Sequence, residues 1–201
     1  MSDLAIDTRQ VCYVIAGGPS LRNFPLDQLP DGYRIGANLS GWFANCDMLV
    51  SIDRNFHNIY EERLRHFPGE VIIGLKPEHL RQTVPGVHYW RFERGDGFST
   101  VPGNLSGSNS GFAAFNAAYL LGFRDIALLG FDFKWHGNEH HWRDDYPSPG
   151  RRYDHQLRVW SRAFEAPAAL VRSEGVRVTN FIGPMGSSVT AFPTLPLAEL
   201  L

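Results

Sequence analysis

The stretch "VCYVIAGGPSL", Val11 to Leu21, places a short apolar run directly before two glycines, a proline and a serine. The run has the length of a buried strand, and the glycines permit a tight turn where it ends. Ser20 can cap a helical turn that follows. Backbone N–H groups freed by such a turn favour an anion such as a phosphate. A tight turn without a ligand is the alternative interpretation.

Apolar runs of strand length recur along the chain and alternate with helical patterns. The runs are Val11–Ala16, Tyr33–Asn38, Asp47–Ile52, Glu70–Leu75, Val87–Trp90, Asp125–Phe133 and Val176–Phe181. The helical patterns are Asn55–Phe67, Ser110–Leu121 and His155–Glu174. This alternation predicts an α/β fold: a Rossmann-like, mostly parallel sheet with helices on both faces. Pro167 predicts a kink or break of the last helix near Glu165.

Length and composition favour a single globular domain over residues 1–201, with 43% hydrophobic and 20% charged residues. The net charge of −2 gives no overall attraction to nucleic acid or anionic membranes. Cys12 and Cys46 have no Cys-x-x-Cys spacing, which predicts buried thiols rather than a disulfide. No apolar run reaches about 18 residues and no secretory signal pattern is present, so we expect a cytoplasmic protein without a membrane span.

A second possible anion site lies at the start of the apolar helical pattern. Ser108, Asn109 and Ser110 can cap this helix, and Gly111 permits close approach of a ligand to its exposed N–H groups. Gly122 can end the helix in the left-handed conformation. Helix capping alone is the alternative explanation of this pattern.

The segment 133–154 follows neither the helical nor the strand period and mixes aromatic, charged, glycine and proline residues. Loops of this length in compact domains commonly bind ligands or close over them, so we expect a lid or acceptor loop. His136, His140 and His141 lie in it, and His155 follows. A histidine beside a pocket can act as a general base, whereas a zinc site is less favoured because no His-Glu-x-x-His pattern is present.

Taken in order, these motifs resemble the family 42 glycosyltransferases, which are sialyltransferases. "YVIAGGPSL" with "LPDGYRIGAN" is similar to the family's first strand, its Asn-Gly-Pro-Ser-Leu loop and its second strand. "SNSGFAAFNAAYLLGFRDIALLGFDF" is similar to its Ser-Gly helix and the strand that follows. Domain of unknown function 115 proteins, which include flagellin glycosylation factors and a pterin pyrophosphokinase, and short phage-encoded proteins look similar too. The resemblance implies a GT-A-variant-like fold and covers most of residues 11–180.

The resemblance implies transfer of a sugar from a nucleotide-activated donor, most simply a CMP-sugar, to an acceptor hydroxyl without a metal or other cofactor. It implies that His155 is the general base. It leaves open whether the acceptor is a glycan, a protein or a nucleic acid, and it implies a possible homo-oligomer, because the family often forms tetramers. The predicted donor-binding residues are Gly17, Gly18, Pro19, Ser20, Asn38, Ser108, Asn109, Ser110, Gly111, Asp132, Lys134 and His140.

The chain departs from the family at several of these positions. The family's loop asparagine is Gly17 here, and Leu39 replaces a glutamine after Asn38. Two family tyrosines that contact the departing phosphate correspond to Lys134 and His140, which are cationic or can become so. These differences leave the nucleotide and the sugar of the donor open.

The sequence also fits two other functions. A related diphosphotransferase would need Mg²⁺ and carboxylates such as Asp53 or Asp132. Asp132 at a strand end can equally have a structural role. A non-catalytic nucleotide or nucleic-acid reader would use a cluster of cations and aromatic rings, although a solvated helix face also explains it. That cluster comprises Arg143, Arg151, Arg152, Arg158, Arg162, Trp142, Tyr153 and Trp160.

Overall fold

The side chains of β1 (Cys12–Ile15) alternate between two hydrophobic cores. Cys12 and Val14 pack into the larger core, and Tyr13 and Ile15 pack into a second core on the other face. A strand buried on both faces is typical of a parallel sheet covered by helices. The structure is a computed structural model that describes residues 6–76, 78, 83–95, 97–143 and 153–201.

The described residues form one nine-stranded sheet in the order β6-β5-β4-β3-β2-β1-β7-β8-β9, and every neighbouring pair is parallel. The remaining strands are β2 (Tyr33–Ala37), β3 (Met48–Ser51), β4 (Glu70–Leu75), β5 (Val87–Glu93), β6 (Asn104–Ser106), β7 (Asp125–Leu129), β8 (Arg177–Ile182) and β9 (Thr194–Pro196). The predicted Rossmann-like α/β fold is confirmed. Strands β6 and β9 were missed because each has only three residues.

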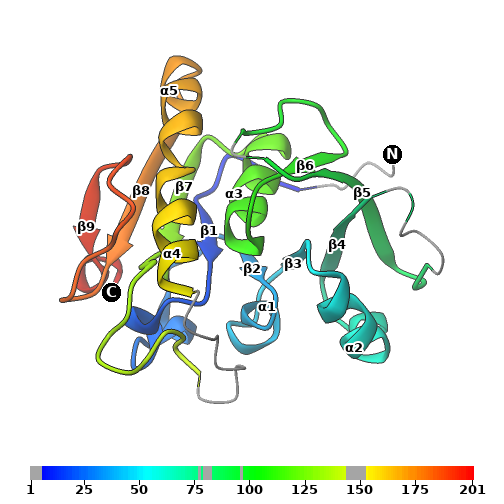
Figure 1. Cartoon of the computed structure of the whole chain (residues 1–201), viewed down its shortest axis with the longest axis horizontal. Helices are drawn as coiled ribbons and strands as arrows, with labels where there is room; N and C mark the ends of the chain where they lie inside the picture. The colour runs from blue at the N-terminus through cyan, green and yellow to red at the C-terminus, as the bar shows by residue number, and fades with distance from the viewer. Residues whose placement is uncertain (1–5, 77, 79–82, 96, 144–152) are drawn as a thin grey trace.

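Helices cover both faces of the sheet, as predicted (Figure 1). The helices α3 (Ser110–Leu120) and α5 (Glu165–Ser173) pack into the larger core, and α4 (Tyr153–Arg162) lies on the same side. The opposite face carries α1 (Ser40–Phe43) and α2 (Arg54–Arg65). Short 3₁₀ helices are formed by Pro19–Leu21, Leu26–Gln28 and Leu197–Leu200.

Several boundaries differ from the prediction. The predicted break in the last helix is confirmed, because α4 ends at Arg162 and α5 begins at Glu165. However, α4 begins at Tyr153 rather than at His155. Strand β7 ends at Leu129 rather than at Phe133, because Gly130 has a φ of +71° and turns the chain out of the sheet.

The order in which the chain adds strands to the sheet reverses at β1. From β1 the chain adds strands toward β6, and α3 then returns it to β7 on the other side of β1. The connections that follow β1 and β7 therefore run to opposite faces of the sheet, although the carboxyl ends of these two strands are neighbours. Ligands of open α/β sheets bind in the crevice that such a divergence creates.

The two thiols agree with the sequence-based prediction. Cys12 and Cys46 are both buried and unoxidised, and burial raises the pKa of each thiol above its ordinary value. Within the described ranges, none of the helices has the length and apolar character required to span a bilayer.

Candidate functional site

A cleft with a volume of about 780 Å³ opens along the carboxyl edge of the sheet. Its walls come from the ends of β1, β2, β3, β5 and β7, from the start of α3 and from one face of α4. Nine residues that the sequence assigned to a donor site line it: Gly17, Gly18, Asn38, Ser108, Asn109, Ser110, Gly111, Lys134 and His140. These residues lie far apart in the sequence, and the parallel topology brings them to one edge.

The glycine turn after β1 lies against the strand end of β7. The N–H of Gly18 donates to the carbonyl of Gly130 over 2.8 Å, and the N–H of Ser20 donates to Oδ2 of Asp132 over 2.7 Å. A Cβ at residue 18 would lie 2.5 Å from that same Oδ2, so only glycine fits there. The expected anion cradle of free N–H groups is therefore wrong for Gly18 and Ser20, whose N–H groups are already bonded. Because Gly17 and Gly18 have no side chains, a ligand in the cleft can approach their backbone closely.

Asp132 has a structural role at this turn. The residue is 1% exposed, and burial raises the pKa of its carboxyl above the ordinary value. Its Oδ1 has no hydrogen-bond partner in the described part of the chain. The cleft lining does not include Asp132, Pro19 or Ser20. These residues can influence a ligand only by holding Gly17 and Gly18 in place.

The start of α3 supplies the N–H groups that the first turn does not. Asn109 is the N-cap, and its Oδ1 accepts from the N–H of Phe112 over 2.9 Å. The N–H groups of Ser110 and Gly111, which lie in the first turn of α3, find no acceptor among the described residues. A Cβ at residue 111 would lie 3.4 Å from that of Ala16, which places this helix start beside the end of β1.

Three polar atoms in the cleft wall lack partners in the described residues. They are Oδ1 of Asn38, Oγ of Ser108 and Nδ2 of Asn109, and each atom is buried. Buried polar atoms are normally hydrogen-bonded, so three unpaired atoms around one cleft indicate a place for a polar ligand. Asn38 also has a φ of +53°, a left-handed conformation that asparagine tolerates better than most residues.

The cleft is positively charged although the protein is not. Lys134, Arg54 and Arg94 line it, and Asp53 is the only acidic residue among the described lining. Oδ1 of Asp53 accepts from the N–H groups of Asn55 and Phe56 and so caps α2. Arg54 and Arg94 are not predicted by the sequence, because each stands singly after a strand, outside any motif.

The four histidines of the sequence analysis separate in space. His140 and His141 line the cleft, and the Nδ1 of His141 accepts from the N–H of Arg143 over 3.1 Å, which places the proton of the neutral ring on Nε2. His136 forms a β-bridge turn with Glu139 outside the cleft lining. No three His, Cys, Asp or Glu side chains gather as metal ligands within the residues that the structure describes.

His155 lies on the far side of α4 from the cleft. The residues of α4 that line the cleft are Tyr153, Gln156, Leu157 and Trp160, which are spaced by three, four and seven and share one face. His155 is exposed and lies off that face. Its role as general base stays a prediction.

The predicted loop 133–154 borders the cleft over its first part. Phe133, Lys134, His140 and His141 line the cleft, and the N–H of Trp142 donates to the carbonyl of Gly17 over 3.1 Å. The prediction of a lid also covers residues 144–152, which lie outside the described residues.

The structure describes six of the eight residues in the predicted cluster of cations and aromatic rings. The guanidinium of Arg143 lies 3.4 Å from the ring centre of Phe43, while Arg158 and Arg162 are exposed on α4. Tyr153 packs edge-on against Trp160, and both line the cleft. Arg151 and Arg152 lie outside the described residues.

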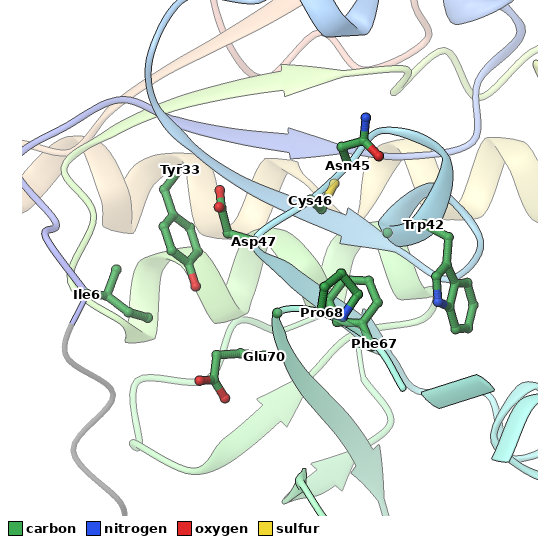
Figure 2. Close-up of a pocket in the computed structure, with 11 residues that line it drawn as sticks. Ile6, Tyr33, Trp42, Asn45, Cys46, Asp47, Phe67, Pro68 and Glu70 are labelled. Atoms are coloured by element: carbon green, nitrogen blue, oxygen red, sulfur yellow. The ribbon is translucent and has the colours of Figure 1, made fainter. Parts of the chain in front are cut away.

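A smaller hollow of about 480 Å³ lies at the opposite edge of the sheet (Figure 2). Tyr33, Asp47 and Glu70, at or next to the amino ends of β2, β3 and β4, surround it. Asp47 accepts from the N–H of Arg34, and Glu70 lies 2.8 Å from Nε2 of His88. Since ligands of open α/β sheets bind at carboxyl ends, the larger cleft is the candidate functional site.

Comparison with known proteins supports the fold. No protein-family model matches the chain, and no curated protein matches it. The fold is similar to that of the MAf glycosyltransferase from Magnetospirillum magneticum AMB-1, with a TM-score of 0.60 and 16% sequence identity. The match covers 98% of this chain and 35% of that chain, so this chain spans about a third of its neighbour's length.

Proposed function

We propose that the protein is a glycosyltransferase that binds a nucleotide-activated sugar in the carboxyl-edge cleft. The observation that carries the proposal is the convergence of the Gly17–Gly18 turn, the open N–H groups of Ser110 and Gly111, and Lys134 on one polar cleft. A structural neighbour that is a glycosyltransferase and the sequence resemblance to family 42 support the same class of reaction.

In this proposal the cleft stabilises a departing phosphate. The acceptor oxygen attacks the anomeric carbon, and the bond from that carbon to the phosphate oxygen breaks with its electron pair on the phosphate. Lys134 and the N–H groups at the start of α3 would stabilise that charge, as preorganised donors do in other transferases. A general base takes the acceptor proton, which strengthens the oxygen as a nucleophile.

The donor is most simply a CMP-sugar. Asn38, Ser108 and Asn109, whose buried polar atoms lack partners in the described chain, would bind its polar groups. No metal is needed if cationic side chains neutralise the phosphate. Two carboxylates that a magnesium-dependent diphosphotransferase would use already have roles in the fold, since Oδ1 of Asp53 caps α2 and Oδ2 of Asp132 accepts from the N–H of Ser20.

Calorimetric titration of the full chain with CMP, UDP, GDP and ADP, with and without Mg²⁺, tests the proposal. We expect one nucleotide to bind without metal, and the variant Lys134→Ala to bind it about tenfold more weakly, since a charged hydrogen bond contributes about 1.5–3 kcal/mol. The control Lys76→Ala removes an exposed lysine that does not line the cleft. A strict Mg²⁺ requirement would favour the diphosphotransferase, and salt-sensitive binding of DNA or RNA alone would favour a nucleic-acid reader.

A further inference from the structure

Within the described part of the chain, the two arginines in the cleft lack the carboxylate partners that four other exposed arginines of the protein have. Arg9, Arg65, Arg91 and Arg177 each lie within ion-pair distance of a carboxylate. Arg54 and Arg94 are exposed, line the cleft, and form no ion pair with any residue that the structure describes. Among the described lining residues, Asp53 is the one acidic side chain, and its Oδ1 accepts from N–H groups at the start of α2.

Both arginines belong to one end of the cleft. Arg54 begins α2, three residues after the end of β3, and Arg94 directly follows β5. In the sheet order these strands are separated only by β4, which corresponds to about 10 Å at the usual spacing of strands. Arginine side chains are long enough to converge on one ligand group across that gap.

Lys134 belongs to the other end, beyond β7. The sheet order places five strand spacings between β7 and β5, or about 24 Å along the sheet. One phosphate group therefore cannot contact both Lys134 and Arg94. The cleft has separate positive regions for two anionic groups.

We propose that Arg54 and Arg94 form a subsite for an acidic group, a carboxylate or a phosphate ester, on the sugar acceptor. The inference rests on the proposed function, which assigns the donor phosphate to Lys134 and the N–H groups at the start of α3. A guanidinium presents paired N–H donors that match the two oxygens of such a group. Phe92 lines the cleft near the end of β5, two residues before Arg94, and offers an apolar ring to the sugar. The acceptor class is thus an acidic sugar.

Nuclear magnetic resonance titrations of the full chain with glucuronate, glucose 6-phosphate and glucose test the subsite directly. We expect at least one acidic sugar to bind about tenfold more tightly than glucose, and the variant Arg54→Ala/Arg94→Ala to lose that preference. Whichever acidic sugar binds identifies the group as carboxylate or phosphate. The control Arg172→Ala removes an exposed arginine of α5 that does not line the cleft, and should keep the preference.

The same variants separate this inference from the proposed function. We expect the double variant to bind the nucleotide identified above within about threefold of the unchanged protein. Equal binding of acidic and neutral sugars, or an unchanged preference in the double variant, overturns the subsite. A tenfold loss of nucleotide affinity in the double variant also overturns it, because the arginines would then bind the donor. Failure of all nucleotides to bind, with acidic sugars still bound, would overturn the proposed function but not the subsite.

Discussion

Gly17 and the ring of His141 occupy adjoining space at the turn after β1: a Cβ at residue 17 would lie 2.5 Å from Cδ2 of His141. His141 is 9% exposed, and its Nδ1 accepts from the backbone of Arg143, so the ring is held in place. The carbonyl of Gly17 in turn accepts from the N–H of Trp142. The resembling family has asparagine at this position of the loop, and here the imidazole fills the space that such a side chain would need.

The variant Gly17→Ala should therefore be destabilised by about 1–3 kcal/mol, because the new methyl group overpacks against the ring. Removing the ring in Gly17→Ala/His141→Ala should recover part of that loss relative to His141→Ala alone. Urea unfolding of the four proteins measures the coupling. Gly97→Ala is the matched control, since a Cβ there would meet nothing within 4 Å and should change stability by less than about 0.5 kcal/mol. Additive effects of the two substitutions would show that the ring does not determine the glycine.

The cap of α3 gives a second prediction. Asn109→Ala removes the side chain that accepts from Phe112, and should lower the free energy of unfolding by about 1 kcal/mol. Asn109→Ser keeps a capping oxygen and should lose much less. Denaturant unfolding of both variants checks this, and equal losses would mean that the amide packs rather than caps.

Much of this site follows from the sequence because strands and caps are local signals. The run Val11–Ala16 and its glycine turn predict a buried strand that ends at a ligand edge, and Asn109 predicts the start of α3. A parallel sheet then places both features at the same edge, whatever the length of chain between them.

The rest depends on contacts that no local pattern contains. The N–H of Ser20 bonds to Asp132, 112 residues away, so the sequence alone could not show that this N–H is already bonded. Arg54 and Arg94 become neighbours only through the order of β3, β4 and β5. The orientation of His155 depends on which face of α4 packs over the cleft, and no local pattern shows this. The helix also begins at Tyr153, two residues earlier than predicted.

Turnover tests the choice of base once a donor is known. Since His155 lies off the face of α4 that lines the cleft, we expect His155→Ala to keep turnover within about threefold. Steady-state kinetics of the variant and the unchanged protein measure this effect. A loss of about 100-fold in His155→Ala, with nucleotide affinity unchanged, would establish His155 as the base that the resemblance implies.

The buried carboxyl of Asp132 predicts a pH dependence of stability. Burial raises its pKa in the folded chain, so above the ordinary value of about 3.9 the folded state holds its proton more tightly than the unfolded state. The contribution of Asp132 to stability therefore falls as the pH rises from about 4 through the raised pKa, and is constant above it. Asp132→Asn keeps an oxygen to accept from Ser20 but cannot ionise. The stability of this variant relative to the unchanged protein should thus increase with pH over that window, as measured by urea unfolding at a series of pH values. Asp27→Asn, at an exposed carboxyl, is the control, and a difference for Asp132→Asn that stays flat or decreases with pH would contradict the assignment.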